Sequence, residues 1–573
     1  MVAVGDNRVP EIAGNYNPTQ VQGFSSALLR DGANDVNKGY RLDLEYKLNK
    51  QHTIRGGLDH NKITALNGTE SAGGGTWTYL RTTPNTVLSG HNISPAAGGG
   101  YGTRGYYVRE NIQRGGSTPT VKQSAQYLED RYQVTDDLVV TLGVRNESFD
   151  NLNGSGETFV EQKNMVAPRL NAAWNVYGDG SLKVFGTAGR YFMQLPANMA
   201  VRFAGASLNT DRFYTYTGVN PVTGAPTGLN PISNVLSANN EFGQEKRANE
   251  LSSTNLKAHY QDEINLGFEK VLSSSFNGGI KLTYRKLKNT IDDYSDPRAI
   301  SAKLTGAEKE YFDDHGWNGA LFNPGKDNTF MIPVGPNGAQ RAVTITAADA
   351  GFPEKAKRTY TSLEFMLEHP MRDGWYGKAN YTWSRSEGNQ EGQTKSDNGQ
   401  ADVGFSSGWD FPETMLNASG LLPNNRTHQF KAYGYYEFTS QFGVGGNLLV
   451  ASGRPKSRTC NIPSALDQEG LGLFQYGSIF FLCPDGANGR GALGTLPTEA
   501  RLDLNFMYKP QQLNGLVFKV DVLNVTNRQV AQAIDEGYNT SGAGAAISPT
   551  ALMETAYSTP RSVRLSAQYS HKF

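Results

Sequence analysis

The chain has 573 residues, of which 38% are hydrophobic, and its mean hydropathy is −0.51. Its apolar runs are all shorter than the roughly 18 residues of a membrane-spanning helix, which excludes such a helix. The 54 basic and 54 acidic residues balance, which argues against a nucleic-acid partner, because a nucleic-acid surface is basic. A transmembrane β-strand stays open, because it needs only about 9–11 residues, half of them polar.

The first ten residues read Met-Val-Ala-Val-Gly-Asp-Asn-Arg-Val-Pro. They have neither the basic segment nor the apolar segment of a signal peptide. If the protein is exported, we expect the chain to lack its natural beginning.

Segments of alternating polarity then recur along the whole chain, which is the period of a half-buried strand. In Tyr40–Leu48 every even position is apolar or aromatic and every odd position is charged or polar. The same alternation marks 138–145, 263–269, 276–285, 375–383 and 501–508. Because side chains on a strand alternate between faces, each segment has one apolar and one polar face.

The connections between these segments alternate between short and long. Short ones lie at 49–50, 135–137, 177–180, 271–275, 370–374, 439–440 and 510–515. The long ones are rich in Gly, Asn, Ser, Thr and Pro. A transmembrane β-barrel has short turns on the periplasmic side and long loops on the extracellular side, whereas a soluble sandwich or propeller has no reason for this asymmetry.

The final strand, Ser562–Phe573, runs to the end of the chain and stops at an aromatic residue. Val563, Leu565, Tyr569 and Phe573 share one of its faces. Taken together, the pattern predicts an all-β protein, a transmembrane antiparallel β-barrel. Thr19–Arg30, rising from the short-turn side, would be the first of about sixteen strands.

Cys460 and Cys483 are the two cysteines, and their spacing matches no zinc motif. In an oxidising compartment they would close one loop through a disulfide; the alternative is a pair of unpaired thiols.

Ser124–Arg145 resembles a hairpin that is widespread in TonB-dependent outer-membrane receptors. Further segments, which occur in a fixed order, resemble the Oar-like branch of that family. These segments are Ala167–Leu170, Gly178–Gly180, Gly189–Phe192, Asn424–Lys431, Ser452–Pro455, Leu502–Leu504, Val520–Asn527, Pro560–Arg561 and the final strand.

The resemblance implies a Gram-negative outer-membrane protein in which the terminal Val563, Leu565, Tyr569 and Phe573 act as an assembly signal. Members of the family have a plug and a 22-stranded barrel, so about sixteen strands imply that residues 1–573 form one barrel domain that lacks its N-terminal part and its plug. Polar residues that face the lumen would hydrogen-bond the plug, and these are Arg41, Asp43, Glu45, Lys281, Arg285, Arg501 and Asp503.

The function implied by the resemblance is energised uptake of a scarce nutrient. The partners would be outer-membrane lipid, the barrel assembly machinery, the TonB complex through the missing N-terminal region, and a substrate that the sequence does not identify. The alternative is a surface-interaction, adhesion or secretion-related barrel without uptake. The sequence has no catalytic motif, no metal-ligand spacing among its eight histidines and no phosphate loop, so we expect neither an enzyme nor a cofactor.

Overall fold

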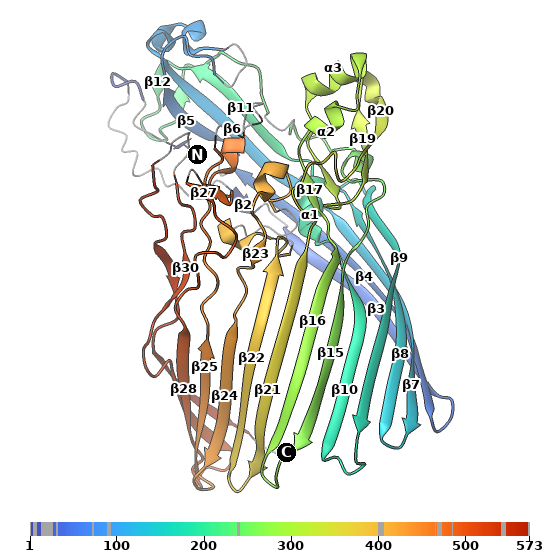
Figure 1. Ribbon diagram of the computed structural model, residues 1–573. Helices are drawn as coiled ribbons and strands as arrows, with labels where there is room; N and C mark the ends of the chain where they lie inside the picture. The colour runs from blue at the N-terminus through green and yellow to red at the C-terminus, as the bar shows by residue number, and fades with distance from the viewer. Residues whose placement is uncertain are drawn as a thin grey trace.

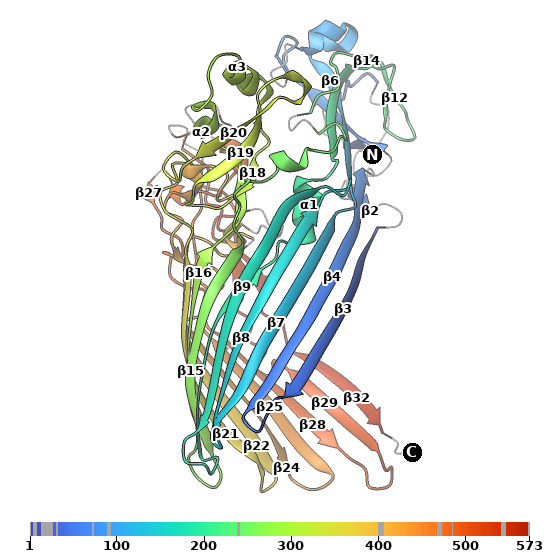
Figure 2. The same cartoon turned by 90° about the vertical axis from the view of Figure 1, so that its right-hand side faces the viewer.

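The computed structural model describes residues 2–3, 8–12, 27–29, 33–71, 74–88, 93–237, 241–392, 394–398, 406–463, 466, 471, 473–483, 485–539 and 546–570. Long strands form a tall, curved wall, with short turns at its lower end and folded loops above its upper end (Figures 1 and 2). The two ends are called the turn end and the loop end below.

The wall is one antiparallel sheet of fifteen strands, each paired with the next along the wall. In order they are β3 (Asn34–Lys47), β4 (His52–Ser71), β7 (Thr120–Thr135), β8 (Leu138–Leu152), β9 (Thr158–Asn175), β10 (Leu182–Met193), β15 (His259–Val271), β16 (Asn277–Asn289), β21 (Arg358–Arg372), β22 (Trp375–Gly388), β24 (His428–Glu437), β25 (Phe442–Ala451), β28 (Glu499–Tyr508), β29 (Leu516–Leu523) and β32 (Ser562–Tyr569). The predicted all-β antiparallel architecture is therefore confirmed.

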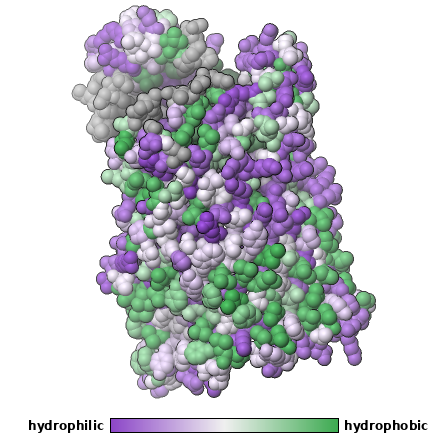
Figure 3. All heavy atoms as spheres, in the orientation of Figure 1, coloured by the Kyte–Doolittle hydropathy of each residue, from purple (hydrophilic) through white to green (hydrophobic). Residues whose placement is uncertain are grey.

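The register between strands sorts the alternating residues onto two faces. Leu42 lies opposite Leu58, and Leu266 lies opposite Leu282, so apolar side chains form a continuous belt on one face. These side chains have no protein layer against them: Leu44 is 66% exposed and Leu266 is 55% exposed. Apolar residues gather on the outer surface of the wall, over its lower part, while the loop end is mostly hydrophilic (Figure 3). An exposed apolar belt around a sheet is the pattern that a lipid-facing wall requires.

Turn-forming residues at the turn end reverse the chain within a few residues. The Asn49 side-chain oxygen accepts hydrogen bonds from the backbone N–H groups of Gln51, at 2.8 Å, and His52, at 2.9 Å. Gly374 has a φ of 79°, a left-handed conformation that costs glycine little. All seven predicted short connections lie between consecutive wall strands, as predicted.

The hydrophobic core lies in the loops above the wall rather than in the wall. Trp409, Phe322, Phe330 and Phe481 are almost completely buried in one cluster of loop residues. The helices and strands around this cluster are β17 (Asp292–Tyr294), α2 (Arg298–Ser301), α3 (Gly306–His315), β18 (Ala320–Phe322), β19 (Asn328–Pro333) and β20 (Gln340–Ile345). The loops thus form compact packed bodies of their own, which gives the loop end a defined shape.

A second sheet rises above the upper end of β4 and contains β5 (Thr76–Arg81), β6 (Tyr106–Ser117) and β11 (Leu208–Thr215). Helix α1 (Ala197–Phe203) packs on a further loop cluster with Leu195 and Phe159. The remaining short strands are β1 (Val2–Ala3), β2 (Ala27–Leu29), β12 (Gly218–Val219), β13 (Pro226–Thr227), β14 (Asn230–Pro231), β23 (Gly420–Leu421), β26 (Leu482–Cys483), β27 (Gly486–Ala487), β30 (Ala531–Ile534) and β31 (Glu554–Tyr557). Single 3₁₀ turns occur at Pro95–Gly98, Gly100–Arg104, Ala248–Glu250, Pro336–Gly338, Ser396–Asn398, Pro412–Met415 and Leu473–Tyr476. Within the described ranges, none of the helices has the length and apolar character needed to cross a membrane.

The wall has two open edges, which β3 and β32 form (Figure 2). In the described part of the chain, β3 pairs along its length only with β4, and β32 pairs only with β29. The first predicted strand, Thr19–Arg30, lies mostly outside the described residues. Its described part, β2, pairs with Thr69–Ser71 at the loop end and does not add a strand to the wall. This position is possible because β4 extends beyond the end of β3 at the loop end, and β2 pairs with the part of β4 that β3 leaves unpaired.

Candidate functional site: the polar face and its arginine cavity

The face opposite the apolar belt carries polar side chains around the whole wall, and we call it the polar face. Residues that lie directly opposite each other on adjacent strands share a face of the sheet. Followed from strand to strand, these pairs place all seven polar residues selected in the sequence analysis on the polar face. The assignment of this face to a barrel lumen stays a prediction.

Most charges on the polar face are neutralised by neighbours on the same or the adjacent strand. Arg41 pairs with Asp43 at 2.7 Å, and Arg285 pairs with Glu263 at 2.5 Å. The other selected residues form the pairs Glu45–Arg55 at 2.8 Å, Lys281–Glu364 at 3.1 Å and Arg501–Asp503 at 3.4 Å. Because all five pairs are partly exposed, each contributes little to stability, typically about 0–1 kcal/mol. Their main effect is to keep the polar face close to neutral.

A cavity of about 420 Å³ opens on the polar face at the loop end. Residues from β15, β16, β21, β22 and β24 line it, together with the loop at 424–426. The lining residues are Gln261, Arg285, Leu287, Arg358, Tyr360, Thr382, Ser384, Ser386, Asn424, Asn425, Arg426 and Gln429. This volume lies within the range of small-molecule sites, which is about 300–1,000 Å³.

Three guanidinium groups line this cavity, and none of the described lining residues is acidic. Arg285 has Glu263 as its partner. Among the described residues, Arg358 donates to two neutral oxygens, the carbonyl of Glu391 and the side-chain oxygen of Gln261 at 3.3 Å. Arg426 donates to the carbonyl of Ser452 at 3.0 Å. Within the described residues, no carboxylate lies within ion-pair distance of Arg358 or Arg426, so the cavity has an excess of positive charge.

Two of the family-like motifs meet to hold Arg426 in place. The Ser384 hydroxyl donates to the Arg426 carbonyl at 2.8 Å, so β22 supports the backbone at this point. Asn425 is buried, and its side-chain oxygen accepts the backbone N–H of Ser386 at 2.7 Å. Ser452, from the second motif, supplies the carbonyl that Arg426 contacts. The loop at 424–427 is therefore fixed against the wall, and the guanidinium is held at the cavity.

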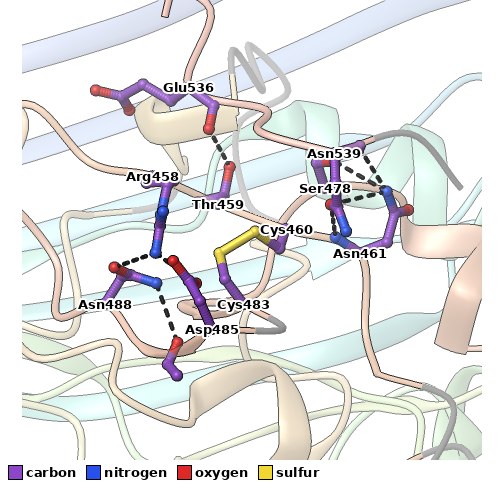
Figure 4. The surroundings of a disulfide bond; sticks show 11 residues. Arg458, Thr459, Cys460, Asn461, Ser478, Cys483, Asp485, Asn488, Glu536 and Asn539 are labelled. Carbon is purple, nitrogen blue, oxygen red and sulfur yellow. Dashed lines mark hydrogen bonds and ion pairs between the residues drawn. A yellow bond between two sulfur atoms is a disulfide. The ribbon is translucent and has the colours of Figure 1, made fainter. Parts of the chain in front are cut away.

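Cys460 and Cys483 are joined by a disulfide in the loop above β25 and β28 (Figure 4). Both cysteines are buried, and Cys460 exchanges backbone hydrogen bonds with Phe480 at 2.9 and 3.0 Å. Arg458 beside them donates to Asp485 at 2.7 Å and to Asn488 at 2.6 Å. The bond therefore joins two loop segments that polar contacts also hold together.

Of the four residues assigned to an assembly signal, three lie on the described part of β32. Val563, Leu565 and Tyr569 are exposed on the same face of this strand. Phe573 lies outside the described residues. The role of the four residues stays a prediction.

The sequence analysis did not select the two arginines without carboxylate partners. Arg426 lies within the Asn424–Lys431 motif, so the motif was a usable signal for it. Arg358 opens β21 after a long loop, and its local sequence has no distinguishing pattern. Its position at the cavity results from the pairing of β21 with β16 and β22.

Comparisons with known proteins agree with this geometry. Residues 148–453 match the family model of the outer membrane beta barrel domain. Over 436 residues the chain is 26% identical to the TonB-dependent transporter Oar of Myxococcus xanthus, and this match covers 72% of the chain and 36% of the relative. The outer membrane transporter YddB from Escherichia coli has a similar structure, with a TM-score of 0.51 and 12% identity. That match covers 93% of this chain and 54% of the transporter.

The chain thus spans about a third of the length of its curated relative and about half of the solved transporter. The family match covers more than half of the chain. It agrees with three features of the structure: the alternating strands, the apolar belt and the short turns at one end of the wall. The chain belongs to the outer-membrane β-barrel family and is a protein of the cell outer membrane.

Proposed function

We propose that this chain forms the barrel wall of a TonB-dependent transporter that takes up a scarce nutrient across the outer membrane. The observation that carries the proposal is the wall itself: it has an apolar outer belt, and its polar face holds a cavity at the loop end. The similarity to the TonB-dependent transporter Oar supports the same role.

In this proposal the polar face lines the lumen, and the packed loops above it collect the solute. The selected charges on that face are paired with neighbours but still partly exposed, and they would also hydrogen-bond a plug. TonB would supply the energy for uptake. The apolar belt would contact lipid, and the aromatic end of the chain would be recognised by the barrel assembly machinery. No chemical conversion of the solute is part of the proposal.

The open edges of the wall bear on how the barrel closes. Hydrocarbon offers no hydrogen-bond partners, and each unsatisfied backbone group there costs several kcal/mol. We therefore propose that further strands lie between β3 and β32 in the membrane and complete the barrel. Cross-linking of cysteines placed at these two edges tests this point, because a direct β3–β32 bond in the membrane would contradict it.

The experiment for the function is nutrient uptake by cells in which the gene is deleted. We expect deletion to abolish growth on one limiting nutrient among a panel of single nutrients. Removal of TonB, or collapse of the proton gradient, should produce the same loss in cells that carry the gene. Unchanged growth on every nutrient, together with a loss of surface attachment, would instead support the adhesion alternative and refute uptake.

A further inference from the structure

We propose that the arginine cavity binds the oxyanion group, carboxylate or phosphate, of a small anionic solute, with Arg358 and Arg426 as the two residues that hold it. This inference rests on the proposed function, because it assigns the chemical class of the transported solute.

Among the described residues, the hydrogen bonds of the two arginines include none to a carboxylate. Elsewhere on the polar face, the described arginines of the selected set have carboxylate partners. Arg358 and Arg426 instead use carbonyl and amide oxygens, which accept hydrogen bonds but carry no full charge. A guanidinium has five N–H donors arranged as a fork that fits a carboxylate or a phosphate. Both groups therefore keep donors for an anion.

The rest of the lining suits an anion with further polar groups. Thr382, Ser386 and Gln429 bring hydroxyl and amide groups to the same cavity. Leu287 and Tyr360 supply a smaller apolar surface. The absence of acidic residues among the described lining residues means that a cationic solute would meet repulsion without compensation.

The wall provides a rigid frame for this site. Arg358 is the first residue of β21 and lies opposite Gly388 of β22, at the loop end of the ladder that joins the two strands. Arg426 lies two residues before β24, on a loop that Ser384 and Asn425 tie to β22. Sites on strands hold their geometry better than sites on free loops. The cavity also lies at the loop end, where a solute from outside the cell would arrive first.

Equilibrium dialysis of the purified chain in detergent, with radiolabelled citrate and inorganic phosphate as probes at low ionic strength, tests the inference. We expect the wild-type chain to retain citrate and the Arg358→Gln/Arg426→Gln double variant to bind it at least about tenfold more weakly, as expected from the loss of charge-assisted hydrogen bonds. The single variant Arg426→Lys, which keeps the charge but loses the fork, should bind with intermediate strength.

Arg385→Gln is the matched control. Arg385 lies on β22 but on the opposite face, where it pairs with Glu387 at 2.7 Å. Its loss should leave citrate binding unchanged. Equal binding by the wild type and the double variant, or an equal loss in the control, would overturn the inference, as would retention of neither probe by the wild type.

A second measurement does not depend on the folding of any variant. Phenylglyoxal modifies accessible arginines, and mass spectrometry reports each site in the wild-type protein in outer membranes. We expect citrate to slow the modification of Arg358 and Arg426 and not that of Arg385; equal rates with and without citrate would contradict the proposal.

These measurements need neither TonB nor a proton gradient. Citrate binding without energised uptake would therefore refute the proposed function alone, whereas TonB-dependent uptake that the double variant leaves intact would refute the anion site alone.

Discussion

Placing an arginine on the two faces of one strand tests whether the apolar belt contacts lipid. Leu504, near the middle of β28, lies opposite Gly446 and Val522 on the belt. The next residue, Asn505, lies on the polar face and donates to Asp521. We expect Leu504→Arg to destabilise the folded protein much more than Asn505→Arg.

The magnitudes follow from the two environments. An arginine at the bilayer midplane costs about 2–4 kcal/mol on the lipid face, which is roughly a 30- to 700-fold change in the ratio of folded to unfolded protein. On the polar face, an arginine at position 505 would still face the Asp521 carboxylate, which already accepts Arg564 at 2.8 Å. We therefore expect a change of about 0–1 kcal/mol there.

The assay is urea unfolding of both variants in phospholipid vesicles, followed by tryptophan fluorescence and by the heat-dependent shift of the folded protein on gels. Leu504→Ala is the control that separates lost packing from the cost of charge. Equal destabilisation by the two arginine variants would refute the assignment of faces or the presence of lipid at the belt.

Four further outcomes are expected. Alkaline washing should leave the full-length protein in the outer membrane, and its release into the soluble fraction would end the barrel interpretation. Phe573→Ser should impair assembly, since the final strand loses its aromatic end; a normal heat-dependent gel shift would count against this. Reduction of Cys460–Cys483 should make residues 454–497 more sensitive to protease while the wall keeps its gel shift, because the bond lies in a loop. Equal cleavage before and after reduction would show that polar contacts alone hold this loop. Burial raises the pKa of Asp292 in the loop strand β17 to about 6 and also raises the pKa of Asp410. The carboxyl groups of Asp292 and Asp410 thus bind protons more tightly in the folded loop than in the unfolded loop. The stability of the folded loop therefore falls as pH rises from about 4 to about 6. Hydrogen exchange at 292–294, corrected for intrinsic rates, should be faster at pH 7.5 than at pH 5, and Asp292→Asn should reduce this difference.

The sequence by itself determined the local part of this structure. Strand faces and tight turns depend on neighbouring residues, so the alternation at Tyr40–Leu48 predicted β3 and its apolar face, and the short connection at 49–50 predicted the turn that follows it. The same alternation predicted the apolar belt, because a side chain's face follows from its position in a strand.

The tertiary structure alone decided which distant residues meet. Arg358 lies on β21 and Arg426 lies on the loop before β24, and the pairing of β21, β22 and β24 brings both guanidinium groups to one cavity. The position of β2 at the loop end likewise depends on the unequal lengths of β3 and β4. The loop core around Trp409 joins segments far apart in the chain, and no local periodicity marks it. Such contacts are set by the pairing of whole strands and by the packing of loops on one another, which a pattern of neighbouring residues does not contain.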